Sequence, residues 1–192
     1  MSFVAELVEY NDEDHMDLAN IIRTVPDFPK PGIGFKDITP ILQQPAAFEW
    51  CLRRLLELCP PAGFDVVLGI EARGFLFGAP LALRAGKPFV PARKPGKLPW
   101  RTVSRSYELE YGTDSLQVHA DACAPGQRVL LVDDLLATGG TLLAAAGLVR
   151  DLGGQPVAAA CVLNLSFLPG RARLEAAGVP VHALLDVDSE EC

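Results

Sequence analysis

The chain has 192 residues, 49% of them hydrophobic, and a formal net charge of −7. This length and composition suffice for a substantial core, so we expect one domain over residues 1–192, and no repeat divides it. The net acidity disfavours nucleic acid as the main ligand, because proteins that bind DNA or RNA normally present a broad basic face.

The chain ends and the cysteines indicate a cytoplasmic protein. Residues 1–17 form an acidic extension without the basic start of a secretory signal, and nowhere do about eighteen apolar residues run together. Five cysteines are an odd number without a Cys-x-x-Cys pair, which argues against both a disulfide framework and a zinc site. We therefore expect a soluble protein with reduced thiols and no membrane partner.

The first half of the chain alternates helical and strand patterns. Apolar residues at helical spacing mark residues 46–58, whereas residues 66–70 read as a buried strand. In chain order we expect a short helix over 18–24, a structured loop from Phe35, a helix over 46–58, a strand over 66–70, a helix over 75–84 and a strand over 88–92.

The second half continues the alternation, which predicts an α/β fold with a doubly wound, largely parallel sheet flanked by helices. Residues 107–110 and 115–118 flank Tyr-Gly-Thr-Asp and predict a hairpin over the sheet. After it we expect a strand over 129–132, a helix over 141–152, a strand over 157–163, a helix over 171–177 and a strand over 181–185.

The segment VLLVDDLLATGGT, residues 129–141, is the most informative part of the chain. A short aliphatic strand comes first, Asp133 and Asp134 stand where we expect it to end, and a glycine-rich loop then opens a helix. Open α/β sheets bind ligands at such strand ends.

This segment matches the two demands of a ribose 5-phosphate. Two carboxylates accept hydrogen bonds from the ribose hydroxyls, and backbone N–H groups and hydroxyls at a helix N-terminus surround the phosphate. The alternative is that the acids cap a helix and the two glycines form an ordinary turn. The candidate residues for this ligand are Asp133, Asp134, Ala137, Thr138, Gly139, Gly140 and Thr141.

A second anion site is predicted at Glu71-Ala72-Arg73-Gly74, directly after the strand over 66–70 and before an apolar helix. Arg73 supplies a planar, permanently charged fork that suits phosphate oxygens. The alternative for Arg73 is a surface ion pair.

Basic residues cluster between Lys87 and Tyr107, a segment that contains no acid. Its prolines and glycine suggest a long mobile excursion, and such loops usually act as lids or are disordered. A solvated charged loop is the alternative. The basic residues of the segment are Lys87, Arg93, Lys94, Lys97, Arg101 and Arg105.

Five motifs in this order resemble the type I phosphoribosyltransferases, and within that family the branch that acts on adenine. The resemblance covers residues 18–165. The motifs are DFPKPGIGFKDITPIL at 27–42, GIEARGFLFGAPLA at 69–82, RKPGKLP at 93–99, YELEYGTD at 107–114 and VDDLLATGGT at 132–141.

The resemblance implies a reaction and its parts. Adenine displaces pyrophosphate from 5-phospho-α-D-ribose 1-diphosphate (PRPP), which gives AMP in purine salvage, and Mg²⁺ enters with PRPP without direct protein ligands. A homodimer is implied, as is a hood for the base over residues 18–45 and a lid loop and hairpin over residues 93–118. Within these parts, a cis peptide bond is implied between Glu71 and Ala72, while Arg73, Arg93, Lys94 and Lys97 face the pyrophosphate, Arg93 from a neighbouring subunit.

For the base, the resemblance implies that Gly34, Phe35 and Lys36 contact adenine, with Lys36 standing where the family often has arginine. Glu110 is implied as the catalytic acid or base near the purine, with Tyr111 helping to close the lid and Arg73 as a second catalytic residue. Periodicity alone does not separate Glu110 from Glu108, because alternate residues of a strand share a face.

Two alternatives remain from the sequence. One is a regulator that senses PRPP without catalysis, although the first twenty residues are too short and acidic for a DNA-binding region. The other is a transferase for hypoxanthine, guanine or xanthine. A P-loop ATPase is excluded because the chain has no GxxxxGK[ST] segment. Residues 167–192 match no motif, and we assign them no function.

Overall fold

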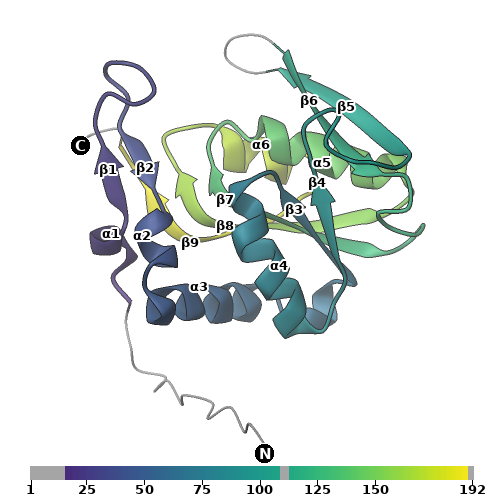
Figure 1. The fold of residues 1–192 in the computed structure, drawn as a ribbon, viewed down its shortest axis with the longest axis horizontal. Helices are drawn as coiled ribbons and strands as arrows, with labels where there is room; N and C mark the ends of the chain where they lie inside the picture. The colour runs from purple at the N-terminus through teal and green to yellow at the C-terminus, as the bar shows by residue number, and fades with distance from the viewer. Residues whose placement is uncertain (1–15, 109–112, 190–192) are drawn as a thin grey trace, which may run out of the picture.

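A computed structural model describes residues 16–108 and 113–189 of the chain. Five parallel strands form its central sheet in the order β4, β3, β7, β8, β9 (Figure 1). The predicted doubly wound sheet is therefore confirmed. Its strands are β3 (Val66–Ile70), β4 (Phe89–Ala92), β7 (Arg128–Leu136), β8 (Gln155–Leu165) and β9 (Val181–Val187).

Alternating side chains of the strands feed two separate hydrophobic cores. On β3, Leu68 belongs to one core and Val67 to the other, as the two-residue period of a strand requires. Helices α5 (Gly140–Asp151) and α6 (Gly170–Ala176) pack on the Leu68 side. Helices α3 (Pro45–Leu58) and α4 (Arg73–Ala85) cover the Val67 side. The helices predicted over 46–58, 75–84, 141–152 and 171–177 are thus confirmed, with ends that differ by at most two residues, as are the strands between them.

The hood differs from its prediction. The helix expected over 18–24 stops early as α1 (Leu18–Ile21), and a strand β1 (Arg23–Val25) follows. Phe35 begins a strand, β2 (Phe35–Asp37), and not a loop, because it pairs antiparallel with Val25. A short helix, α2 (Thr39–Leu42), and a 3₁₀ turn, η1 (Pro61–Gly63), were not predicted.

The hairpin stands at the other end of the molecule from the hood (Figure 1). Its strands, β5 (Thr102–Glu108) and β6 (Thr113–His119), pair antiparallel over their full length and are longer than predicted. Leu116 and Val118 of β6 are fully buried and belong to the same hydrophobic core as α5. A bridge between Arg93 and Gln117 ties the base of the hairpin to the end of β4.

Within the described ranges, no helix is long and apolar enough to cross a membrane.

Candidate active site

The two acids lie inside β7 and not at its end, which corrects the sequence prediction. Strand β7 continues to Leu136 because it stays paired with β8, where Asp133 stands opposite Cys161. The pairing of β7 with β3 stops earlier, at Val132. Asp133 and Asp134 therefore project beyond the end of β3, at the point where the order of the parallel sheet reverses and where such sheets bind ligands.

Desolvation disfavours the charged forms of both carboxyls and raises their pKa values. Desolvation and repulsion from Asp134 raise the pKa of Asp133 well above its ordinary value. Desolvation also raises the pKa of Asp134, whose side chain is only 4% exposed, although the Arg73 guanidinium opposes this shift. A ligand that donates hydrogen bonds to both carboxylates would replace the water they lack.

Arg73 is placed against the acids by the start of α4. Its Nε lies 2.9 Å from Asp134 Oδ2. The contact is an ion pair without hydrogen-bond alignment, because that oxygen has no donor among the described residues. Gly74 permits this closeness, since a Cβ there would lie 2.6 Å from the Val132 carbonyl oxygen and 3.1 Å from Asp133 Oδ1. This role of Gly74 was not predicted.

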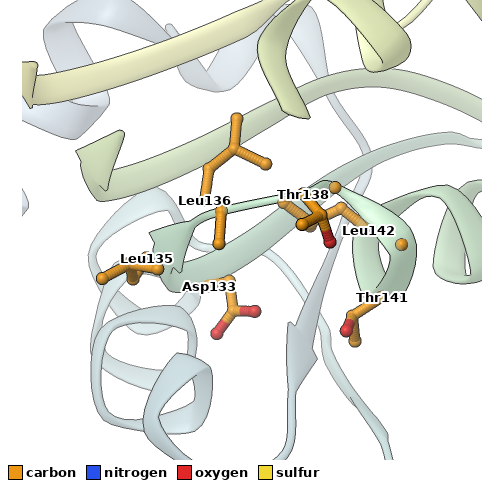
Figure 2. Close-up of a pocket in the computed structure, with 9 residues that line it drawn as sticks. Asp133, Leu135, Leu136, Thr138, Thr141 and Leu142 are labelled. Carbon is orange, nitrogen blue, oxygen red and sulfur yellow. The ribbon is translucent and has the colours of Figure 1, made fainter. Parts of the chain in front are cut away.

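The glycine-rich loop follows β7 and opens α5, as predicted. Gly139 is the N-cap of α5 and has a φ of 80°, a conformation that favours glycine. A pocket of about 90 Å³ is lined by Asp133 and by residues 135–142. Figure 2 shows the Asp133 carboxylate and the Thr141 hydroxyl on the same side of the chain, with Leu136 pointing away from them. The predicted PRPP residues Ala137, Thr138, Gly139, Gly140 and Thr141 all line this pocket.

Helix α6 braces the loop, which the sequence did not reveal. A Cβ on Gly170 would lie 2.1 Å from the Ala137 carbonyl oxygen, so only glycine allows α6 to approach so closely. Three residues later, Arg173 Nη1 donates a hydrogen bond of 2.7 Å to the Thr138 carbonyl oxygen. The segment after residue 166, which matched no motif, therefore supports the phosphate loop.

The hood brings the predicted base-binding residues toward Arg73. The Phe35 ring centroid lies 5.3 Å from Arg73 Cζ, a cation–π contact, and 5.1 Å from the Phe28 ring in an edge-to-face arrangement. Gly34 precedes Phe35 and is half-buried. Lys36 Nζ donates to the Thr24 hydroxyl at 3.0 Å, across the β1–β2 ribbon.

The basic segment is anchored to Glu71 through Arg93 and Lys94. Glu71, which is joined to Ala72 by the expected cis peptide bond, accepts two hydrogen bonds from Arg93, at 3.2 and 3.0 Å, and one from the Lys94 N–H at 2.8 Å. The Arg93 side chain therefore lowers the pKa of Glu71. Arg93 Nη1 also donates a hydrogen bond of 3.2 Å to the carbonyl oxygen of Lys97, which is exposed.

Lys94 is held by the hairpin. Its Nζ donates to the Tyr107 hydroxyl at 3.0 Å and to the Asp114 carboxylate, which lowers the pKa of Asp114. Glu110 and Tyr111, the predicted catalytic residue and its neighbour, lie outside the described residues. The contacts of Arg93, Lys94 and Lys97 with a pyrophosphate stay predictions.

Comparison with known proteins identifies the family. Residues 43–180 match the phosphoribosyl transferase domain. An adenine phosphoribosyltransferase of Serratia proteamaculans is 54% identical over 165 residues, which cover 86% of this chain and 83% of that protein. The chain belongs to the adenine phosphoribosyltransferases. Another member, from Pseudoalteromonas atlantica, is 50% identical over 90% of this chain and 97% of its own length.

Solved structures of adenine phosphoribosyltransferases share the fold. That of Thermoanaerobacter pseudethanolicus has a TM-score of 0.85 and 52% identity, over 88% of this chain and 98% of its own. The Saccharomyces cerevisiae enzyme, solved with adenine and an imino-altritol bisphosphate, has a TM-score of 0.81 and 40% identity, over 88% and 96% of the two chains.

Proposed function

We propose that this protein transfers the 5-phosphoribosyl group of PRPP to N9 of adenine, giving AMP and pyrophosphate, in purine salvage. The observation that carries this proposal is the pocket that Asp133 shares with the loop over residues 137–141, with Asp134 next to it on β7. It places acceptors for vicinal hydroxyls next to donors for a phosphate, which is the pattern of a ribose 5-phosphate. The activity named for the related proteins supports the same substrates.

The reaction separates charge, and the site offers groups of both signs. As the bond from C1′ to the leaving oxygen breaks, the ribose becomes cationic and pyrophosphate gains negative charge. Asp133 and Asp134 would hold the ribose hydroxyls, while Arg73, 2.9 Å from Asp134, would face the pyrophosphate. Fixed charges of this kind stabilise a transition state without having to reorganise. Attack by N9 on the opposite face inverts the anomeric carbon.

Mg²⁺ belongs to the substrate in this proposal. The described part of the chain has no group of three or more His, Cys, Asp or Glu side chains that could hold a metal ion. Mg²⁺ commonly binds phosphate oxygens and water with few protein ligands, so Mg-PRPP is the substrate form that fits this donor set.

For the base, the hood supports a role of Gly34, Phe35 and Lys36 in covering adenine, because Phe35 already packs against Arg73. We assign general acid–base catalysis to Glu110. This assignment rests on the resemblance of YELEYGTD, residues 107–114, to the corresponding family motif.

We further propose a cytoplasmic homodimer. The four cysteines of the described ranges, Cys51, Cys59, Cys123 and Cys161, are buried free thiols, as a reducing compartment allows. The dimer follows from the family resemblance, in which Arg93 reaches the pyrophosphate of a neighbouring subunit.

The deciding experiment measures product formation from PRPP and Mg²⁺ with adenine, hypoxanthine, guanine and xanthine supplied in parallel. We expect turnover with adenine alone. Turnover with an oxopurine alone would keep the mechanism and overturn the base assignment. PRPP binding without turnover on any base would instead support a sensing protein.

A further inference from the structure

A second pocket runs along α5 from Gly140 to Arg150. It has a volume of about 430 Å³ and lies between β5 and helices α5 and α6. Three arginines line it, one from each of these elements, and its lining includes no acidic side chain among the described residues. These arginines are Arg105 of β5, Arg150 of α5 and Arg173 of α6, and we call the site the arginine pocket.

The positive charge of this pocket is only partly compensated by hydrogen bonds. Arg105 Nη1 donates to the Asp151 carboxylate at 2.9 Å. The other two arginines donate to carbonyl oxygens, Arg150 to Ala177 and Arg173 to Thr138, each at 2.7 Å. A carbonyl carries no net charge, and each of these bonds uses one of the five N–H donors of a guanidinium.

A glycine of α5 makes room for one of the three arginines. A Cβ on Gly147 would lie 2.4 Å from Arg105 Nε, so this glycine lets the Arg105 side chain lie across α5. Leu143 and Tyr107 add apolar and aromatic surface to the lining. A space of this size exceeds what a single phosphate group fills, and it is within the range of small-molecule sites.

We propose that the arginine pocket binds the phosphate groups of a small phosphorylated metabolite. Planar guanidinium forks match phosphate oxygens in pairs, and three forks around one space suit a ligand with more than one phosphate. The pocket shares Gly140 with the phosphate loop, but none of its three arginines is among the residues proposed to hold PRPP.

Arg173 couples the two sites. It lines the arginine pocket and also holds the Thr138 carbonyl oxygen of the phosphate loop. An anion bound by the remaining N–H donors of this guanidinium would shift the Arg173 side chain, and with it the loop that Arg173 holds. Occupancy should therefore change the KM for PRPP, a consequence that rests on the proposed function.

Binding is tested by calorimetry with inorganic triphosphate as the probe. The test variant is the double substitution Arg105→Gln and Arg150→Gln. The matched control is Arg84→Gln, which removes an arginine of α4 from its surface ion pair with Glu49 of α3. The single Arg150→Gln variant, which keeps the bond between Arg105 and Asp151, serves if the double variant unfolds.

We expect wild type and control to bind triphosphate at two classes of site, one in each pocket. In the double variant, one class should weaken by about tenfold to a hundredfold, as the loss of hydrogen bonds to a charged group implies. Equal binding by all three proteins would overturn the proposal. ATP that binds more tightly than triphosphate would identify a nucleotide, and equal affinities would identify recognition of the phosphates alone.

AMP formation separates the two proposals. If the arginine pocket is real, triphosphate changes the KM for PRPP in the control, and part of that change disappears in the double variant. Absence of AMP formation in every protein would overturn the proposed function and leave the binding result standing. Normal AMP formation with equal triphosphate binding would overturn only the arginine pocket.

Discussion

Arg73 is the residue on which the site converges. It contacts Asp134 of β7 and the Phe35 ring of the hood while standing at the start of α4. One side chain thus touches the proposed ribose and base regions, although 40% of it is exposed. Its removal should affect ligand binding far more than folding.

We predict that Arg73→Ala raises the Kd for Mg-PRPP about tenfold to a hundredfold, because a hydrogen bond to a charged group contributes about 1.5–3 kcal/mol. Calorimetry on the purified variant measures this, with Arg84→Ala as the control for loss of a surface arginine of α4. Unchanged binding would remove Arg73 from the site.

Glu110 and Glu108 are separated by a second pair of variants. If Glu110 moves a proton at the base, Glu110→Gln should lower kcat by about 10²–10⁴, whereas Glu108→Gln should leave it within a few-fold. The KM for PRPP should stay similar in both variants. A loss of tenfold or more confined to Glu108→Gln would show that the assignment is wrong.

At the scale of residues, the sequence predicted site residues that lie close together along the chain and missed those brought together only by folding. The acids and the loop over 137–141 lie within nine residues, so their spacing alone indicated the ligand. Gly74 contacts β7, and Gly170 and Arg173 contact the loop, across more than thirty residues each. No spacing rule relates such distant positions, and only the packing of α4 and α6 brings them together.

At the scale of elements, long periodic segments were predictable and short ones were not. Helix α3, with fourteen residues, carries a clear apolar repeat, whereas β1 and β2 have three residues each and exist through pairing with each other. Strand β7 appeared to end at Val132 because the aliphatic run stops there. Hydrogen-bonded pairing with β8 extends β7 past Asp133 and Asp134 to Leu136.

The contact between α6 and the phosphate loop yields a prediction for an element otherwise unassigned. Gly170→Ala would bring a methyl group against the Ala137 carbonyl oxygen and Leu136, so the loop or the helix must shift. We expect a loss of about 1–3 kcal/mol in stability, as overpacking typically costs. We also expect the KM for PRPP to rise about tenfold while the KM for adenine is unchanged.

Thermal unfolding and initial rates measure both effects. Gly63→Ala is the matched control, since a Cβ at Gly63 meets nothing within 4 Å. A Gly170→Ala enzyme with lower stability but an unchanged KM for PRPP would mean that α6 supports the fold alone.

An ion pair between Asp65 and Arg128 joins the beginnings of strands β3 and β7, and its contribution to stability depends on pH. Arg128 donates to Asp65 through its backbone N–H and its guanidinium, and these bonds lower the Asp65 pKa to about 2. An unfolded chain has the ordinary aspartate pKa of about 3.9. The stabilisation is therefore present above about pH 4 and is lost as the pH falls toward 2.

We predict that Asp65→Asn lowers the urea midpoint at pH 7 and that the difference from wild type disappears near pH 2. Urea titrations at several pH values measure this. Glu57→Gln, which breaks exposed ion pairs on α3, is the control and should leave the wild-type acid dependence in place. Parallel curves for wild type and Asp65→Asn would contradict the prediction.

At the scale of the whole molecule, the sheet order explains why distant motifs meet. Strands β4 and β3 lie on one side of β7, and β8 and β9 lie on the other, so the chain reverses direction across the sheet between β3 and β7. The segments after β3 and at the end of β7 border the resulting crevice. The hood and the hairpin stand at opposite ends of this frame (Figure 1).

Arg93 follows β4, and its Nη2 lies 3.0 Å from the Glu71 carboxylate of its own chain. In the proposed homodimer, the pyrophosphate contact of Arg93 is made in the partner's site. Mixing two inactive subunits distinguishes this arrangement from a contact within one chain, because the two defects would then fall in different sites.

We predict that Arg93→Ala and Asp134→Asn proteins, each nearly inactive, recover activity when they are unfolded together and refolded as a mixture. Half of the dimers should then be mixed, and one of the two sites in each mixed dimer has both residues intact, so about a quarter of the wild-type activity should return. The measurement is AMP formation, and size-exclusion chromatography checks that dimers have formed. Dimers without recovered activity would place Arg93 in the site of its own subunit, next to the Glu71 that holds it. A monomer with full wild-type activity would contradict the proposed dimer itself.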